Sequence, residues 1–300
     1  MSELFWGIDM GGTKIEGVVL ETSPQLNILS RLRIPTEQEF GYEHVLNQFK
    51  KLVGLLIEET GQKPHRIGIG TPGIIDFTTH LIKNSNTKCI IGKPMKEDLQ
   101  QLLGIEVRMA NDANCFAIAE SHLGVVPDFV KNPEVVFGVI MGTGVGSGIV
   151  VNGKVINGKH GIGGEWGHNS LDEHGELCYC GQRGCVETFI SGPATENHYY
   201  NLSGNKLKLK EIYKLYQGHD PNAMATIDRM MHYFGRAIAT VINIVDPEVI
   251  VFGGGVGNLD VIYERGKEEV LKHLFNGELN TLFLRPKLGD SAGVIGAALL

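Results

Sequence analysis

The stretch Leu4-Phe5-Trp6-Gly7-Ile8-Asp9-Met10-Gly11-Gly12-Thr13-Lys14 places a short apolar strand directly before a glycine turn, and a second apolar strand follows at residues 15–20. The same design returns at residues 135–151, where an apolar strand runs into Gly142-Thr143-Gly144-Val145-Gly146. Glycine removes the side chain that would keep a phosphate group away from the backbone amides. We therefore predict a duplicated α/β architecture with two phosphate-binding turns that face each other across a cleft.

The first turn has two other interpretations. It does not open a helix in the Gly-x-Gly-x-x-Gly pattern, so a dinucleotide fold is not indicated, and it lacks the Walker spacing. An ordinary β-hairpin would also explain it. If the turn binds phosphate, Asp9 at the end of the strand is placed to hold magnesium through water.

A cluster of cysteines forms the second signal. Cys178, Cys180 and Cys185 lie within eight residues, and His168 precedes the first of them by ten. Three thiolates and one imidazole make a closed tetrahedral set, which predicts a structural zinc site; a redox pair or buried thiols are the alternative. Glu165 and Glu187 bracket the cluster and are not needed as ligands. We predict that the metal holds these carboxylates and His168 toward a polar substrate.

Composition excludes several classes of protein. The chain has 300 residues, 42% hydrophobic and 20% charged, which suits one large globular domain or two of ordinary size. The net charge of −7 and the lack of a basic run argue against nucleic acid as a partner. No apolar run approaches about 18 residues, so no membrane span is expected. Free thiols without an export signal predict a cytoplasmic protein.

Polar residues follow further predicted strands. A strand at 67–70 ends in Thr71-Pro72-Gly73, and one at 107–110 runs into Asn111-Asp112 before a helix at 115–122. Asp112 is either the cap of that helix or a catalytic base at the carboxyl end of a strand. The loop at 83–87, which contains Asn86, either lines a polar pocket or is solvated.

We predict later helices at 188–200, 207–216, 223–245, 260–275 and 291–300, and a glycine turn at 253–255 that suits a nucleobase or ribose.

These motifs together resemble the ROK sugar kinases (repressor, open reading frame, kinase) over essentially the whole chain. The matching segments are residues 7–14, 70–73, 111–114, 142–146, 164–168, the cysteine cluster through Glu187, and 253–255. The resemblance implies an actin-like ATPase fold, with two ribonuclease-H-like α/β domains around an interdomain cleft. We expect a small domain at 1–112 plus 290–300 and a large one at 113–289. The resemblance further implies ATP-dependent phosphorylation of a hexose, at the 6-hydroxyl of fructose, mannose or glucose, by an enzyme of a kind that is often a homodimer.

The resemblance also assigns roles to residues. It makes Asp112 the general base for the sugar hydroxyl. The remaining sugar contacts that it implies are Gly73, Asn86, Asn111, Glu165, His168 and Glu187. The nucleotide contacts that it implies, with magnesium near Asp9, are Asp9, Gly11, Gly12, Thr13, Lys14, Gly142, Thr143, Gly144, Val145, Gly146, Gly254 and Gly255.

The choice of sugar rests on one aromatic residue. Glu165-Trp166-Gly167-His168 looks most like the fructokinase and mannokinase branch, whereas N-acetylglucosamine kinases more often carry Phe where Trp166 stands. We therefore expect fructose, mannose or glucose, with N-acetylglucosamine as the alternative. A DNA-binding repressor of the same family is disfavoured, because the first turn begins at Gly7 and leaves no room for a helix-turn-helix domain. A sugar-binding protein without catalysis is disfavoured by Asp9, Asp112 and both glycine turns.

Overall fold

The structure, a computed structural model, describes residues 4–22, 26–76 and 78–300. The chain divides into two compact units, each with its own hydrophobic core. The first unit comprises Met1–Gly124, Lys154–Gly163 and Leu288–Leu300, and the second comprises Val125–Gly153 and Gly164–Lys287. The predicted domain boundaries, after residues 112 and 289, stay a prediction.

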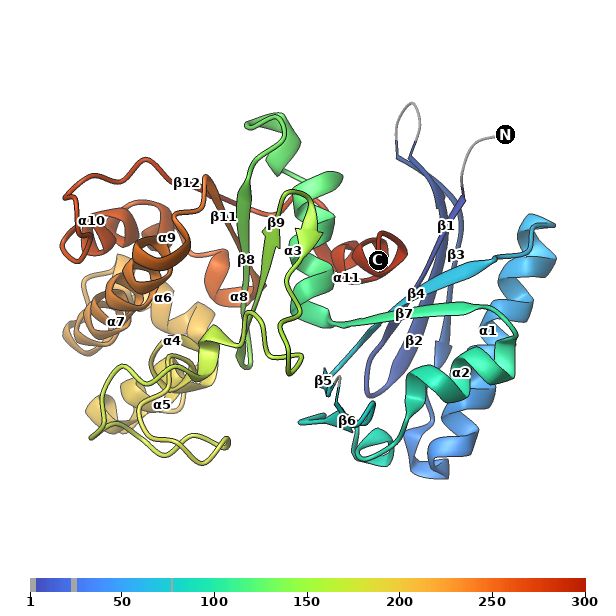
Figure 1. Ribbon diagram of the computed structural model, residues 1–300. Coiled ribbons are helices and arrows are strands. Elements are labelled where there is room, and N and C mark those ends of the chain that lie inside the picture. The colour runs from blue at the N-terminus through green and yellow to red at the C-terminus, as the bar shows by residue number, and fades with distance from the viewer. Residues whose placement is uncertain (1–3, 23–25, 77) are drawn as a thin grey trace. The chain divides into compact units, whose positions relative to one another are not determined.

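The first unit is built on a five-stranded sheet in the order β3-β2-β1-β4-β7 (Figure 1). Its strands are β1 (Leu4–Met10), β2 (Lys14–Glu21), β3 (Asn27–Pro35), β4 (Arg66–Thr71) and β7 (Glu106–Asn111). The first three form an antiparallel meander, and β1, β4 and β7 run parallel. The unit also contains β5 (Ile74–Ile75), β6 (Ile82–Lys83) and β10 (Lys154–Val155).

Helices cover both faces of this sheet. α1 (Tyr42–Thr60) packs on one face, where Gly17 lies under Leu52 and Leu56. α11 (Ala292–Ala298) packs on the other face with α3 (Asp112–His122), while α2 (Met95–Leu103) lies beside β7. A Cβ atom on Gly68 would stand 1.7 Å from the carbonyl oxygen of Ala297, so only glycine lets α11 lie this close to β4.

The second unit repeats the strand design of the first. β8 (Val135–Met141) and β9 (Val145–Val151) form an antiparallel hairpin, and β8, β11 (Val249–Gly253) and β12 (Leu282–Leu284) run parallel. The order β9-β8-β11-β12 matches β2-β1-β4-β7, which confirms the predicted duplication. α7 (Pro221–Val245) supplies a buried stripe to the core, as its helical spacing predicted.

Shorter helices complete the chain, and two predicted helices were wrong in extent. The predicted helix at 188–200 is two helices, because Ser191 begins a new one by accepting a hydrogen bond from the Ala194 amide at 3.2 Å. The predicted helix at 260–275 is interrupted at Glu264, which has φ −98° and ψ −89°, and it ends at Leu271. The helices concerned are α4 (Glu187–Ile190), α5 (Gly192–Ser203), α6 (Leu209–Gln217), α8 (Gly254–Gly257), α9 (Asp260–Tyr263) and α10 (Arg265–Leu271). Among the described residues, no helix is both long and apolar enough to cross a membrane.

Candidate functional site

Three predicted site segments meet at one edge of the sheet in the first unit. Asp9 of β1 stands opposite Gly70 of β4, and Thr71 of β4 stands opposite Asn111 of β7. The carboxyl ends of these parallel strands therefore deliver the glycine turn, the Thr71-Pro72-Gly73 turn and Asp112 to the same edge. Open α/β sheets bind their ligands at this edge.

Asp112 is the first residue of α3 and is not its cap. The cap is Asn111, whose side-chain oxygen accepts a hydrogen bond from the Asn114 amide at 2.7 Å, so the capping interpretation of Asp112 was wrong. Asp112 Oδ1 accepts a hydrogen bond from the Ala113 amide at 2.8 Å, which orients the carboxylate. Desolvation by burial raises the pKa of the Asp112 carboxyl, against the smaller opposing effect of hydrogen bonds from the backbone amides of Ala113 and Asp112.

Asp9 lies between two glycines. A Cβ atom on Gly70 would stand 3.2 Å from Asp9 Oδ1, and one on Gly293 of α11 would stand 2.9 Å from Oδ2. Desolvation, followed by the charges of Asp112 and Glu16, raises the pKa of Asp9 to about 6, against a smaller opposing effect of Lys14. No local sequence pattern indicates Gly293, because its pairing with Asp9 depends on α11 returning to the first unit from the far end of the chain.

Replacing Asp9 with Asn should stabilise the protein above pH 6. The folded-state pKa is raised from 3.8 to about 6, so the ionised carboxylate opposes folding at high pH and the neutral acid does not. A pKa shift of about two units corresponds to a gain of up to about 3 kcal/mol in the free energy of unfolding at pH 8. This gain should shrink as the pH falls from 6 toward 4. Urea unfolding of the wild type and the Asp9→Asn variant between pH 4 and pH 8 measures the difference in the free energy of unfolding. A difference that does not change with pH would contradict the raised pKa.

The turn at 10–14 is fixed by hydrogen bonds from Thr36 and Gln38, which no local sequence pattern indicates. The Gly11 amide donates to the Lys14 carbonyl at 2.8 Å, Thr36 Oγ1 donates to the Gly11 carbonyl at 2.7 Å, and Gln38 Nε2 donates to the Gly12 carbonyl at 2.9 Å. In the described part of the chain, the backbone amides of Gly12 and Thr13 donate no hydrogen bond. Two adjacent unpaired amides in a rigid turn are suited to a phosphate oxygen.

Two predicted sugar-binding loops of the first unit lie together. Gly73 has φ 99°, and a Cβ atom there would stand 2.7 Å from the Lys83 carbonyl and 2.9 Å from Cβ of Ser85. This close approach brings the turn after β4 against the loop that contains Asn86. Asn86 is exposed, and its side-chain oxygen is 3.4 Å from Thr87 Oγ1.

In the second unit, both glycine turns lie at the carboxyl edge of the sheet. Gly253 of β11 stands opposite Ile140 of β8, and a Cβ atom on Gly254 would be 2.3 Å from the Met141 carbonyl. Gly254 and Gly255 are exposed, and a Cβ atom on Gly255 would meet nothing within 4 Å. The segment is a single helical turn, α8, rather than the open turn predicted. The two exposed glycines place backbone without side chains beside the start of the 142–146 turn.

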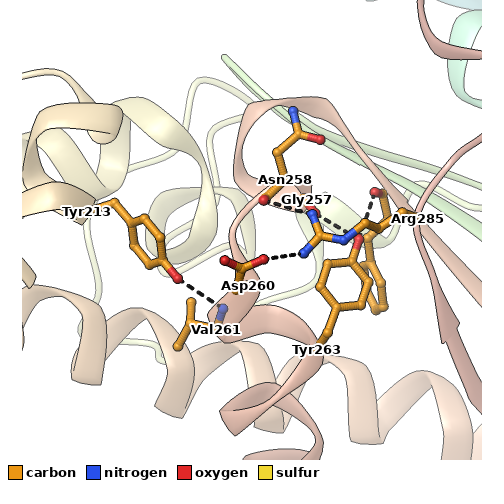
Figure 2. A network of polar contacts seen from close by, with 8 residues as sticks. Tyr213, Gly257, Asn258, Asp260, Val261, Tyr263 and Arg285 are labelled. Carbon is orange, nitrogen blue, oxygen red and sulfur yellow. Dashed lines mark hydrogen bonds and ion pairs between the residues drawn. The ribbon is translucent and has the colours of Figure 1, made fainter. Parts of the chain in front are cut away.

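A polar network fixes the segment that follows α8, and Figure 2 shows Arg285 within it reaching both Asn258 and Asp260. The guanidinium donates to the Asn258 carbonyl at 2.9 Å, pairs with Asp260 at 2.7 Å and lies 4.2 Å from the ring centroid of Tyr263. The Tyr263 hydroxyl in turn donates to the Gly257 carbonyl at 2.8 Å, and burial raises the pKa of Tyr263 to about 12. The network therefore anchors the carboxyl end of α8.

Replacing Arg285 with Met should loosen this segment. The ion pair is exposed and contributes little, so we expect a loss of only about 1 kcal/mol in global stability, mostly from the ring contact and the carbonyl hydrogen bond. Hydrogen exchange at 254–258 should become faster. Lys272→Met is the matched control, because it breaks an exposed ion pair with Glu269 that holds no glycine segment. Equal hydrogen-exchange rates at 254–258 in the Arg285→Met and Lys272→Met variants would rule out the anchoring role of Arg285.

The predicted metal ligands converge in the second unit. The ligand atoms of His168, Cys178, Cys180 and Cys185 all lie within 4.8 Å of one another and could hold a metal ion. His168 Nδ1 is 3.6 Å from the Cys178 sulfur, and the Cys180 and Cys185 sulfurs are 3.5 Å apart. The other ring nitrogen of His168, Nε2, is 3.0 Å from the Tyr179 hydroxyl. Tyr179 was missed, although its position between two of the cysteines is a usable signal.

The residues around the cluster differ in their surroundings. Trp166 is 5% exposed, packs edge-on to Phe137 and donates its ring N–H to the Ala237 carbonyl at 3.1 Å. Trp166 is therefore a core residue, and its ring is not exposed for contact with a sugar. Glu165 precedes the short turn that carries His168, and its carbonyl accepts from the His168 amide at 3.2 Å. Glu187 begins α4, and its Oε2 accepts a hydrogen bond from the Val145 amide at 2.8 Å.

Two units with the same hairpin-plus-parallel sheet, each with a glycine turn at the carboxyl edge, define the actin-like ATPase class of fold. The sequence profile of the ROK family matches residues 5–300, and the chain belongs to that family. The fold class and the family resemblance inferred from the sequence are confirmed.

Relatives and solved structures cover nearly the whole chain. An N-acetyl-D-glucosamine kinase of Histophilus somni is 35% identical over 308 residues, spanning 99% of this chain and 98% of its own. The crystal structure of a ROK hexokinase from Thermus thermophilus matches with a TM-score of 0.88 and 33% identity, over 99% of this chain and 97% of the other. A ROK glucokinase from Streptomyces griseus, in complex with glucose and AMPPNP, matches with a TM-score of 0.74 and 25% identity, over 99% and 98%.

Proposed function

We propose that this ROK-family protein is an ATP-dependent sugar kinase that transfers the γ-phosphoryl group to a sugar hydroxyl. The observation that carries the proposal is Asp112, which stands at the carboxyl end of β7 with a fixed carboxylate and a raised pKa. A carboxylate of raised pKa at a ligand-binding edge is suited to take a proton near neutral pH. Full-length relatives named as sugar kinases support the same activity.

The roles follow from what phosphoryl transfer requires. The reaction needs little covalent chemistry from the protein, so positioning and charge stabilisation dominate. Asp112 accepts the proton of the attacking hydroxyl. The unpaired amides of Gly12 and Thr13 bind phosphate oxygens, and the bare face of Gly254 and Gly255 accepts the nucleoside. Hydroxyl binding is assigned to Gly73, Asn86 and Asn111 of the first unit and to Glu165, His168 and Glu187 of the second.

N-acetylglucosamine is the favoured sugar. The expectation of an unsubstituted hexose rested on Trp166, which is buried in the core, whereas the curated relatives at 34–36% identity are N-acetyl-D-glucosamine kinases. Glucose is the second candidate, because the similar solved structures include a hexokinase and a glucokinase that binds glucose. Fructose and mannose remain predictions from the sequence alone.

An ADP-release assay with N-acetylglucosamine, glucose, mannose and fructose tests both levels of the proposal. We expect N-acetylglucosamine to give the highest kcat/KM and glucose the next. A higher value for fructose or mannose would restore the choice drawn from the sequence. ADP release with none of the four would refute sugar kinase activity on hexoses.

We assign zinc to the His168, Cys178, Cys180 and Cys185 cluster. Zinc–thiolate bonds of about 2.3 Å in a tetrahedron hold sulfur atoms about 3.8 Å apart, close to the 3.5 Å between the Cys180 and Cys185 sulfurs. A closed set of four protein ligands supplies structure rather than a reactive water. Asp9 would hold magnesium through water, and the ion would supply neutralisation of phosphate charge there. A homodimer in the cytoplasm that binds no nucleic acid stays a prediction.

A further inference from the structure

Glu187 contacts the glycine turn at 142–146 as well as adjoining the metal ligands. Its Oε2 accepts the Val145 amide at 2.8 Å, and a Cβ atom on Gly144 would lie only 2.6 Å from the same oxygen. A side chain at position 144 would therefore displace the carboxylate. Glycine at this position permits the contact, in addition to any approach of phosphate to the backbone.

The segment that carries Glu187 is itself fixed at both ends. Cys185, two residues earlier, is fully buried in the metal-ligand cluster, and the Val186 amide donates to the Asn169 carbonyl at 2.9 Å. Beyond α4, the Gly192 amide donates to the Gly142 carbonyl at 2.9 Å. The turn is thus held to the α4–α5 segment at two points, one by the backbone of Gly142 and the other by Glu187.

The two oxygens of the Glu187 carboxylate have different surroundings. Oε2 is engaged by the turn, whereas no group among the described residues hydrogen-bonds to Oε1. A carboxylate can accept hydrogen bonds at both oxygens simultaneously. Oε1 is therefore available to a sugar hydroxyl without loss of the contact to Val145.

We propose that Glu187 is a positioning residue that couples the sugar subsite to the phosphate-binding turn at 142–146. A sugar hydroxyl on Oε1 restrains the carboxylate, and the carboxylate restrains the Val145 amide and the turn. Sugar binding then makes the turn more favourable for nucleotide, and the coupling is reciprocal. This inference rests on the proposed function, since it assumes that the second unit binds sugar at Glu187 and phosphate at the turn.

The test compares the full-length wild type with Glu187→Ala, Glu187→Gln and Glu165→Ala. Titration calorimetry measures the Kd of Mg-AMPPNP without sugar and at saturating N-acetylglucosamine, and hydrogen exchange measures protection of the Val145 amide without ligand. We expect sugar to tighten wild-type nucleotide binding by about fivefold or more. Glu187→Ala should lose this coupling and the Val145 protection. Glu187→Gln should keep both, because its amide oxygen still accepts from Val145 while its NH₂ group reaches the hydroxyl.

Glu165→Ala controls for loss of a second proposed sugar contact, carried by the residue that precedes the short turn with His168. It should weaken sugar binding but retain the coupling at saturation and the Val145 protection. Wild-type coupling and protection in Glu187→Ala would overturn the inference while leaving kinase function intact. A wild type that binds neither ligand would refute the proposed function and the coupling together, whereas the exchange data would still report on the contact to Val145.

Discussion

Replacing Asp112 with Asn should lower kcat by about 10²–10⁴-fold, because the amide cannot take the proton from the sugar hydroxyl. The substitution preserves size and the hydrogen bond that position 112 accepts from the Ala113 amide. We therefore expect the Kd of sugar and nucleotide to change little and α3 to remain folded. Steady-state kinetics together with titration calorimetry separates the loss of chemistry from loss of binding.

Asn111→Ala is the comparison variant for the loss of local structure, and because Asn111 is also assigned to hydroxyl binding, it should raise the KM for sugar as well. It removes the helix cap next to Asp112 and should cost about 1 kcal/mol of stability. If Asp112 matters only through the start of α3, the two variants should lose turnover to a similar extent. A kcat near that of the wild type in Asp112→Asn would remove this residue from the mechanism.

Replacing Cys185 with Ala should release the bound metal and destabilise the second unit by several kcal/mol. The thiol is fully buried, and its loss leaves the remaining ligands of the cluster without a closed set. Elemental analysis should give about one zinc per wild-type chain and much less in the variant. Thermal unfolding should show the same decrease in stability when the wild type is treated with a strong chelator.

Cys89→Ala provides the control for loss of a thiol. Cys89 is partly buried, free of any disulfide and outside the ligand cluster, so its replacement should leave the metal content unchanged. Wild-type metal content in Cys185→Ala would contradict the assignment of this residue as a ligand. Wild-type protein that contains no metal and is insensitive to chelation would contradict a structural zinc site.

The sequence predicted the features that depend on local pattern. The glycine turns at 10–14 and 142–146, the spacing of the cysteines and the helical stripe of α7 each led to the observed arrangement. These signals lie within one segment of chain, so periodicity and residue type are sufficient to read them.

The features that the sequence did not predict depend on contacts between distant segments. Gly293 returns on α11 to flank Asp9, and Glu187 reaches Val145 across 42 positions of sequence. The role of Asp112 stayed open between helix cap and catalytic base because Asn111 and Asp112 are adjacent and both residue types cap helices well. Trp166 was used to choose a branch of the family by its residue type, but the short turn there directs its ring to the core.

A crystal structure with N-acetylglucosamine and AMPPNP bound tests the central claim most directly. We predict that an Asp112 carboxylate oxygen lies about 2.6–3.2 Å from the sugar hydroxyl that is in line with the γ-phosphorus. A hydroxyl in line for transfer, with Asp112 out of hydrogen-bonding reach and another residue in its place, would contradict the account.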